Sequence, residues 1–218
     1  MTYENERKRI IETCLLMQKK EFFLGTWGNV SMRVGDRILL TPSKVCYDTM
    51  KPEDIVVIDL EGNKIEGDRT PTSEKEVHRQ IYVKRNDVNA IVHAHTKHCM
   101  ALSATGLTAV PCITEEMSQL LGGAIPLTKG YVPAGEHFKL GAAAAEVIAD
   151  KNGVILKNHG PVACGRDMDE AILVTTAMEK ACEIYSLLLN DVKVNPIPEN
   201  FVESERYRFL YSYGHEKT

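Results

Sequence analysis

A chain of 218 residues can bury a sizeable core without disulfides or a structural metal. Its formal net charge of −4 and its pI near 6.0 exclude a general electrostatic attraction to nucleic acid, so any phosphate must be held by a local site. The six scattered cysteines lack a Cys-x-x-Cys pair, the N-terminus is highly charged, and no apolar run is long enough to span a membrane. These features predict a cytoplasmic protein with reduced thiols.

The first half of the chain predicts helices separated by short strands. Apolar residues at spacings of three and four between Glu4 and Glu21 predict an opening amphipathic helix. Residues 37–40 and 55–58 are apolar runs bounded by prolines and by a Glu-Gly-Asn turn, which is typical of strands. Further along, we expect a helix over residues 73–83, a strand over 90–95 and a helix over 97–104.

The second half predicts one long helix among shorter elements. Asp167, with Glu170 three residues later, forms a capping box for that helix. One apolar stripe of the helix predicts core or a subunit interface; it comprises Ala171, Val174, Met178, Cys182, Tyr185 and Leu189. We also expect a weak helix over residues 115–121, helices over 138–149 and 199–211, and a strand over 154–156. Without repeats or a linker, residues 1–218 are predicted to form a single α/β domain.

Histidines stand in or after two of the predicted strands. His93 and His95 lie two residues apart in a strand, so their rings point to one face. They could instead be hydrogen-bonded, half-buried histidines. His159 follows the strand over 154–156, and strand ends are places where a fold brings distant side chains together. Three histidines with a nearby carboxylate would match a catalytic zinc site that leaves one position for substrate.

Glu74 is the best candidate for that carboxylate, although an acid in a first helical turn can simply stabilise the helix dipole. Thr72 and Ser73 offer hydroxyls beside unpaired N–H groups at the same helix start, which is a natural cradle for phosphate. Ser73 could equally be only the N-cap, with Glu76 completing a capping box. Two further polar turns that could bind an anion are Gly25-Thr-Trp-Gly-Asn29 and Thr41-Pro-Ser43.

In their order along the chain, these stretches resemble the class II aldolase/adducin family. The matching stretches are Gly25-Thr-x-Gly-Asn-Val-Ser31, Thr41-Pro-Ser43, Pro71-Thr-Ser-Glu74, His93-x-His95, Asn158-His-Gly160 and Tyr213-Gly214. They span nearly the whole chain, and the ordered set is far more specific than any single member. The resemblance implies an α/β/α sandwich of three layers around a largely antiparallel central sheet. It also implies a homotetramer with active sites at subunit interfaces.

The resemblance further implies a zinc-dependent aldolase that reversibly cleaves a ketose 1-phosphate to dihydroxyacetone phosphate and an aldehyde. Its implied metal ligands are Glu74, His93, His95 and His159, with Glu74 also acting as base. Imidazole and carboxylate ligands suit Zn²⁺, Mn²⁺ and Co²⁺ alike. The implied phosphate-binding residues are Thr26, Gly28, Asn29, Ser43, Thr72 and Ser73.

The acid catalyst is where the pattern departs from the family. An aldolase of this family places a catalytic tyrosine before a Gly-Gly pair, whereas this chain has Glu115-Glu116 before Gly122-Gly123. Glu116 could replace that tyrosine, or it could be a solvated helix glutamate. Tyr131 is another candidate donor, and Tyr213 matches a tyrosine that closes the site from the adjacent subunit.

Other activities use the same scaffold. They include aldolases for 5-deoxyribulose or methylthioribulose phosphates, methylthioribulose-phosphate dehydratases and ribulose-5-phosphate 4-epimerases. The later acids characteristic of the epimerases are not evident in this chain. Adducin-like relatives are structural proteins that lack the metal ligands, and all four implied ligands are present here.

Overall fold

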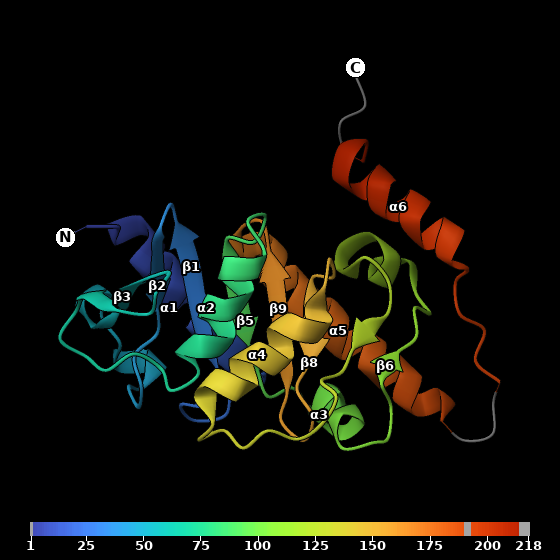
Figure 1. Cartoon of the computed structure of the whole chain (residues 1–218), viewed down its shortest axis with the longest axis horizontal. Coiled ribbons are helices and arrows are strands. Elements are labelled where there is room, and N and C mark those ends of the chain that lie inside the picture. Colours follow the sequence, from blue (N-terminus) through green and yellow to red (C-terminus); the bar gives the residue numbers. More distant parts are fainter. Residues whose placement is uncertain (1, 190–192, 214–218) are drawn as a thin grey trace.

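The computed structural model describes residues 2–189 and 193–213. Seven strands form one sheet in the order β4-β3-β2-β1-β5-β9-β8, and each neighbouring pair is antiparallel (Figure 1). The strands are β1 (Asn29–Val34), β2 (Arg37–Leu40), β3 (Val56–Asp59), β4 (Lys64–Glu66), β5 (Ala90–His93), β8 (Gly153–Ile155) and β9 (Pro161–Gly165). A separate pair joins β6 (Ala109–Val110) to β7 (Ile125–Pro126). The prediction of a largely antiparallel central sheet is confirmed.

Helices cover both faces of this sheet. In Figure 1, α2 (Lys75–Lys84) and α4 (His137–Ile148) lie over the face towards the viewer, with α1 (Glu4–Lys19) and α5 (Met168–Leu188) behind it. On strand β2, Ile38 and Leu40 pack with residues of α2 and α4, while Leu39 packs with residues of α1. Successive side chains of a strand point to opposite faces, so this apolar run is buried by a helical layer on each side. The predicted three-layer sandwich is confirmed.

The remaining elements lie at the edges of the sandwich. Helix α3 (Lys97–Ser103) packs against α5, and α6 (Glu199–Tyr211) packs against a π-helical turn, η3 (Met117–Leu121). Two short 3₁₀ turns, η1 (Tyr47–Thr49) and η2 (Pro52–Asp54), lead into β3. Val202 of α6 is buried in the same apolar cluster as Leu121 of η3. The weak helix predicted over residues 115–121 is present: residues 115 and 116 are α-helical and continue into the π-helical turn Met117–Leu121.

Three local predictions need correction. Helix α2 begins at Lys75 with Glu74 as its N-cap, so the capping box of Ser73 and Glu76 is wrong; the Glu76 carboxylate instead accepts hydrogen bonds from Arg79. Strand β5 ends at His93 rather than at residue 95. The stripe on α5 is buried except at Leu189, which lies past the helix end with 49% of its surface exposed.

The long helix starts at the predicted N-cap, but the predicted capping box is only half formed. The Asp167 side chain accepts a hydrogen bond from the Glu170 backbone N–H at 2.8 Å. The Glu170 carboxylate does not return to Asp167; it accepts from the backbone N–H of Arg166 at 2.6 Å. The cap at Asp167 therefore fixes the start of the helix that supports the back of the sheet.

Two predictions drawn from the composition concern the cysteine thiols and the length of apolar segments. All six cysteines are free, and five of them are buried. Burial raises the pKa of Cys164 to about 12, so this thiol stays protonated at neutral pH. Within residues 2–189 and 193–213, no helix is both long and apolar enough to traverse a bilayer.

Candidate active site

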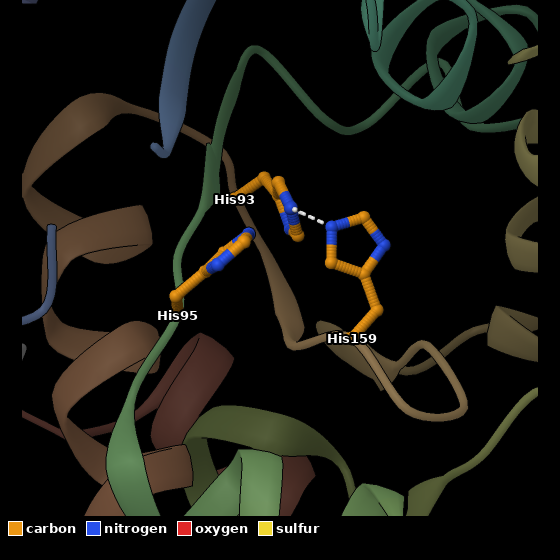
Figure 2. A group of neighbouring side chains, drawn as sticks. All are labelled: His93, His95 and His159. Carbon is orange, nitrogen blue, oxygen red and sulfur yellow. Dashed lines mark hydrogen bonds between the residues drawn. The ribbon is translucent and has the colours of Figure 1, made fainter. Parts of the chain in front are cut away.

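Three imidazole rings converge at one end of the sheet. His93 is the last residue of β5, His95 follows two residues later, and His159 lies in the turn between β8 and β9. The ring centroids are 5.2 Å apart for His93 and His95, 4.8 Å for His93 and His159, and 5.0 Å for His95 and His159. One nitrogen from each ring lies within 4.8 Å of the others. Figure 2 shows the three rings facing one another. The structure thus brings together the three histidines that the sequence singled out.

The turn that carries His159 is shaped by its two neighbours. Asn158 adopts the left-handed conformation with φ of 53°, and the Leu156 N–H donates to the Gly160 carbonyl at 2.9 Å, closing the turn. A Cβ on Gly160 would lie only 2.3 Å from the Ala94 carbonyl oxygen. Glycine is therefore required at residue 160 because the turn presses against the backbone between His93 and His95.

A Gly160→Ala substitution should displace His159 from the other two rings. Because the Ala94 oxygen is backbone, the turn itself must shift, and a displacement of about 1 Å can cost roughly 10²-fold in rate. We expect the variant to fold but to show lower metal affinity and turnover that is lower by roughly tenfold or more. Gly106→Ala is the matched control because a Cβ there meets no atom within 4 Å. Unchanged metal affinity and activity in Gly160→Ala would contradict this account.

The hydrogen bonds of His93 define which nitrogen is available. Its Nδ1–H donates to the Pro161 carbonyl at 2.9 Å, so Nε2 carries the lone pair in the neutral ring. That Nε2 lies 3.3 Å from His159 Nε2 and 3.3 Å from Glu74 Oε2, and the other Glu74 oxygen lies 3.1 Å from His159 Nε2. Lone pairs that converge in this way repel unless a cation or a proton lies between them. The donor set of imidazoles and one carboxylate therefore fits a metal ion such as zinc.

Burial keeps the His93 and His95 imidazoles in the neutral form that binds metals. Desolvation lowers the pKa of His93, and it lowers the pKa of His95 to about 3 with the help of the neighbouring rings. Burial alone would raise the pKa of Glu74, but the His93 and His159 rings and the Asn29 amide outweigh it and hold this pKa below its ordinary value. At neutral pH His93 and His95 thus offer neutral rings beside an ionised Glu74 carboxylate.

A cavity of about 360 Å³ opens beside this cluster. All six residues predicted to bind phosphate line it: Thr26, Gly28, Asn29, Ser43, Thr72 and Ser73. Glu74, His95 and His159 line the same cavity. A ligand that fills it would reach hydroxyl groups at one part and the histidine cluster at another.

Lys44 is a lining residue that sequence reasoning missed. It has φ of 58°, a left-handed conformation that is uncommon for a residue with a side chain. Among the described residues that line the cavity, Lys44 is the one lysine or arginine. Its position directly after Ser43 in a polar turn was the available signal. The side chain supplies a positive charge that the hydroxyl groups lack.

Removing the charge of Lys44 should weaken the binding of a phosphorylated substrate. Exposed charge pairs contribute about 0.2–1 kcal/mol, so Lys44→Gln should raise KM roughly 1.4- to fivefold with little change in kcat. Lys44→Arg keeps both the charge and the left-handed backbone and is the control. Initial-rate kinetics at low and high salt test this, because the difference between the variants should shrink as salt screens the charge. An equal KM for both variants would contradict a role in binding phosphate.

Trp27 provides a natural probe of the site. It is the only tryptophan in the chain, its side chain is largely exposed, and its ring stacks near His95 at a centroid distance of 6.2 Å. The residue lines the cavity. Its fluorescence should therefore respond to ligands and metals bound there.

The three candidate proton donors lie outside this cavity in their own chain. The Glu116 carboxylate accepts from Lys180 Nζ at 2.7 Å, on the surface. Tyr131 is exposed, although Ala134 of the same loop lines the cavity. Tyr213 is exposed beyond α6, with its ring 6.2 Å from that of Phe209. Their roles in catalysis stay predictions.

Together, the fold and the cluster define a three-layer α/β protein with a three-histidine group able to hold a metal ion. The family described as class II aldolase and adducin N-terminal domain matches residues 8–186. The chain belongs to this family.

Relatives and solved structures agree with that assignment. The L-fuculose phosphate aldolase of Methanocaldococcus jannaschii is 37% identical over 185 residues, which cover 84% of this chain and 97% of the relative. That of Haemophilus influenzae is 36% identical over 183 residues, covering 84% of this chain and 83% of the relative. A solved L-fuculose 1-phosphate aldolase matches with a TM-score of 0.90 at 27% identity, covering 97% and 99% of the two chains. A putative aldolase/epimerase/decarboxylase from Klebsiella pneumoniae matches with a TM-score of 0.84 at 25% identity, covering 94% and 100%.

Proposed function

We propose that this protein is a zinc-dependent aldolase that reversibly cleaves a ketose 1-phosphate such as L-fuculose 1-phosphate to dihydroxyacetone phosphate and an aldehyde. The observation that carries this proposal is the meeting of three imidazoles and the Glu74 carboxylate beside a cavity lined by hydroxyl groups and Lys44. The names of the relatives support the substrate class.

The phosphate would bind in the polar part of the cavity. Thr26, Ser43, Thr72 and Ser73 supply hydroxyl donors there, and Lys44 supplies charge. Binding the phosphate away from the reacting carbons orients the sugar, so that its ketone end faces the histidine cluster.

The ketone end would meet His93, His95, His159 and Glu74. A Zn²⁺ ion held by these residues would act as a Lewis acid that stabilises negative charge developing on the ketone oxygen. Glu74 would accept the proton of the hydroxyl group beyond the scissile bond. The carbon–carbon bond then breaks, its electron pair moves towards the ketone, and the hydroxyl-bearing carbon becomes the aldehyde. A proton delivered to the remaining carbon completes dihydroxyacetone phosphate. Glu116 or Tyr131 would supply it, or else Tyr213, which would come from a neighbouring subunit.

The assembly that this chemistry needs is part of the same proposal. A cytoplasmic homotetramer with its cavities between neighbours would bring exposed aromatic residues such as Tyr131 and Tyr213 to the site of an adjacent chain. Sedimentation analysis of the purified protein measures the number of chains, and a monomer would leave Tyr213 without access to any site.

A coupled assay tests the function directly. Zinc-replete protein is incubated with L-fuculose, L-rhamnulose, ribulose and 5-deoxyribulose 1-phosphates, and dihydroxyacetone phosphate is measured by its reduction with NADH and glycerol-3-phosphate dehydrogenase. We expect cleavage of at least one of these ketoses, loss of cleavage after chelation, and recovery when zinc is added back. Release of no dihydroxyacetone phosphate, with epimerised or dehydrated sugar phosphates appearing instead, would replace the aldolase by one of the other activities of this scaffold.

A further inference from the structure

A line of buried polar side chains runs from Glu74 into the layer between β1 and α2. Asn29 and Ser31 lie two residues apart on β1, so they share a face of the strand. Glu74, His78 and Tyr82 are spaced by four at the start of α2 and along it, so they share a face of the helix. The side chains of Ser31, His78 and Tyr82 are fully buried and do not line the cavity.

Four hydrogen bonds join these side chains in sequence. Asn29 Nδ2 donates to Glu74 Oε2 at 2.7 Å, and Asn29 Oδ1 lies 2.5 Å from His78 Nε2. Ser31 Oγ lies 2.7 Å from His78 Nδ1 and 2.8 Å from the Tyr82 hydroxyl. Both polar atoms of the Asn29 side chain therefore already have partners within the protein.

The chemistry of each group sets the direction of every bond. The ionised Glu74 carboxylate only accepts, so the NH₂ of Asn29 must face it and the amide oxygen must face His78. His78 must then donate from Nε2, which in a neutral ring leaves Nδ1 as an acceptor. Ser31 donates its single proton to Nδ1, and its oxygen accepts from Tyr82. All four donors therefore point towards Glu74.

We propose that His78, Ser31 and Tyr82 are positioning residues that hold the Asn29 amide, and through it one oxygen of Glu74, in the orientation that proton abstraction requires. This role rests on the proposed aldolase function of Glu74. The proposal also changes the role expected of Asn29, because its side chain orients the Glu74 carboxylate rather than binding the phosphate. Only one carboxylate oxygen is anchored in this way, and the other faces His159 at 3.1 Å.

Kinetics separate positioning from binding. His78→Leu removes the donor to Asn29, and we expect kcat for the ketose 1-phosphate cleaved by the wild type to fall about 10- to 100-fold, as for other outer partners of metal sites. KM should change less than about threefold, and one zinc ion per chain should remain bound. His78→Gln, which can still donate to Asn29, should recover much of the loss. A His78→Leu enzyme with kcat within twofold of the wild type, or with only a raised KM, would overturn the proposal.

A second pair of variants covers the case in which His78→Leu does not fold. Ser31→Ala keeps the ring but removes the donor that selects its tautomer, and we expect a severalfold lower kcat at unchanged KM. Ser103→Ala is the matched control, because it removes another buried serine hydroxyl that donates only to the Met100 carbonyl in α3. Equal kcat values for Ser31→Ala and Ser103→Ala would overturn the proposal.

Nitrogen NMR tests the chain of hydrogen bonds without any substrate. In protein labelled with ¹⁵N-histidine, the His78 signals are assigned by their loss in His78→Gln. We expect a neutral ring protonated on Nε2, and a change in this pattern in Ser31→Ala. A ring protonated on Nδ1 would refute the proposed direction even if the enzyme is an aldolase. A correct tautomer in a protein that cleaves no ketose phosphate would instead refute the proposed function, and with it the role assigned to His78.

Discussion

Replacing His95 by alanine should abolish both metal binding and turnover. Among the described residues three rings form the cluster, and the loss of His95 leaves two of them and a carboxylate around any ion. If the metal stabilises the developing charge by several kcal/mol, its loss lowers the rate by roughly 10³-fold or more. Turnover and zinc content of the purified variant are the measurements.

Two comparisons sharpen the test of His95. His98→Ala removes a nearby histidine whose Nδ1 is bonded to Glu179 rather than to the cluster, so its zinc content and activity should match those of the wild type. Titration with Co²⁺ should quench Trp27 fluorescence in the wild type, since that ring stacks near His95. His95→Ala protein that keeps a full complement of zinc and full activity would refute the assigned ligand.

Replacing Glu74 by glutamine should lower kcat about 10²- to 10⁴-fold, the usual contribution of a general base. The amide has nearly the shape of the carboxylate and still fits beside Asn29, but it cannot accept a proton at neutral pH. The loss should persist when zinc is in excess, because three histidines remain to hold the ion. Single-turnover cleavage at saturating zinc measures the chemical role apart from metal affinity.

Glu76→Gln is the matched control for Glu74. Glu76 lies two residues further along the same helix and binds Arg79, so its loss should affect stability rather than turnover. If Glu74→Gln kept more than about a tenth of the wild-type kcat with zinc in excess, another group would have to be the base. The ratio of the kcat values of Glu74→Gln and Glu76→Gln thus isolates the role of Glu74.

The sequence predicted much of the fold because the signals were local. The apolar runs at residues 37–40 and 55–58 correspond to β2 and β3, and the capped helix after Asp167 is α5. Strand β1 was missed because Asn29-Val-Ser-Met begins inside a polar, glycine-rich stretch. Strand β9 was missed because it opens with proline and follows a tight turn at His159. That the whole chain is a single domain stays a prediction.

The candidate site was predictable in its residue types but not in its connections. His93 and His95 were paired by strand alternation, yet β5 ends at His93, and the rings meet because the chain continues past the strand end. Asn29 reaches Glu74 because β1 pairs with β5 in a register that sets Asn29 opposite His93. Such registers join segments far apart in sequence, so no local pattern reveals them.

The row of hydrogen-bonded side chains behind Glu74 could be recognised only once the fold was known. Spacing by four joins Glu74, His78 and Tyr82, and spacing by two joins Asn29 and Ser31. Each spacing alone is common. Together they indicate a hydrogen-bonded row, because α2 lies over β1 and the polar faces of the two elements contact each other.

X-ray absorption at the zinc edge of the reconstituted enzyme tests the central claim most directly. One ion per chain should show nitrogen and oxygen ligands at about 2.0–2.1 Å, with the scattering pattern of three imidazoles. The three-imidazole pattern should be lost in His159→Ala. A zinc ion bound through sulfur at about 2.3 Å, or an unchanged spectrum in His159→Ala, would mean that these histidines and Glu74 do not share a metal.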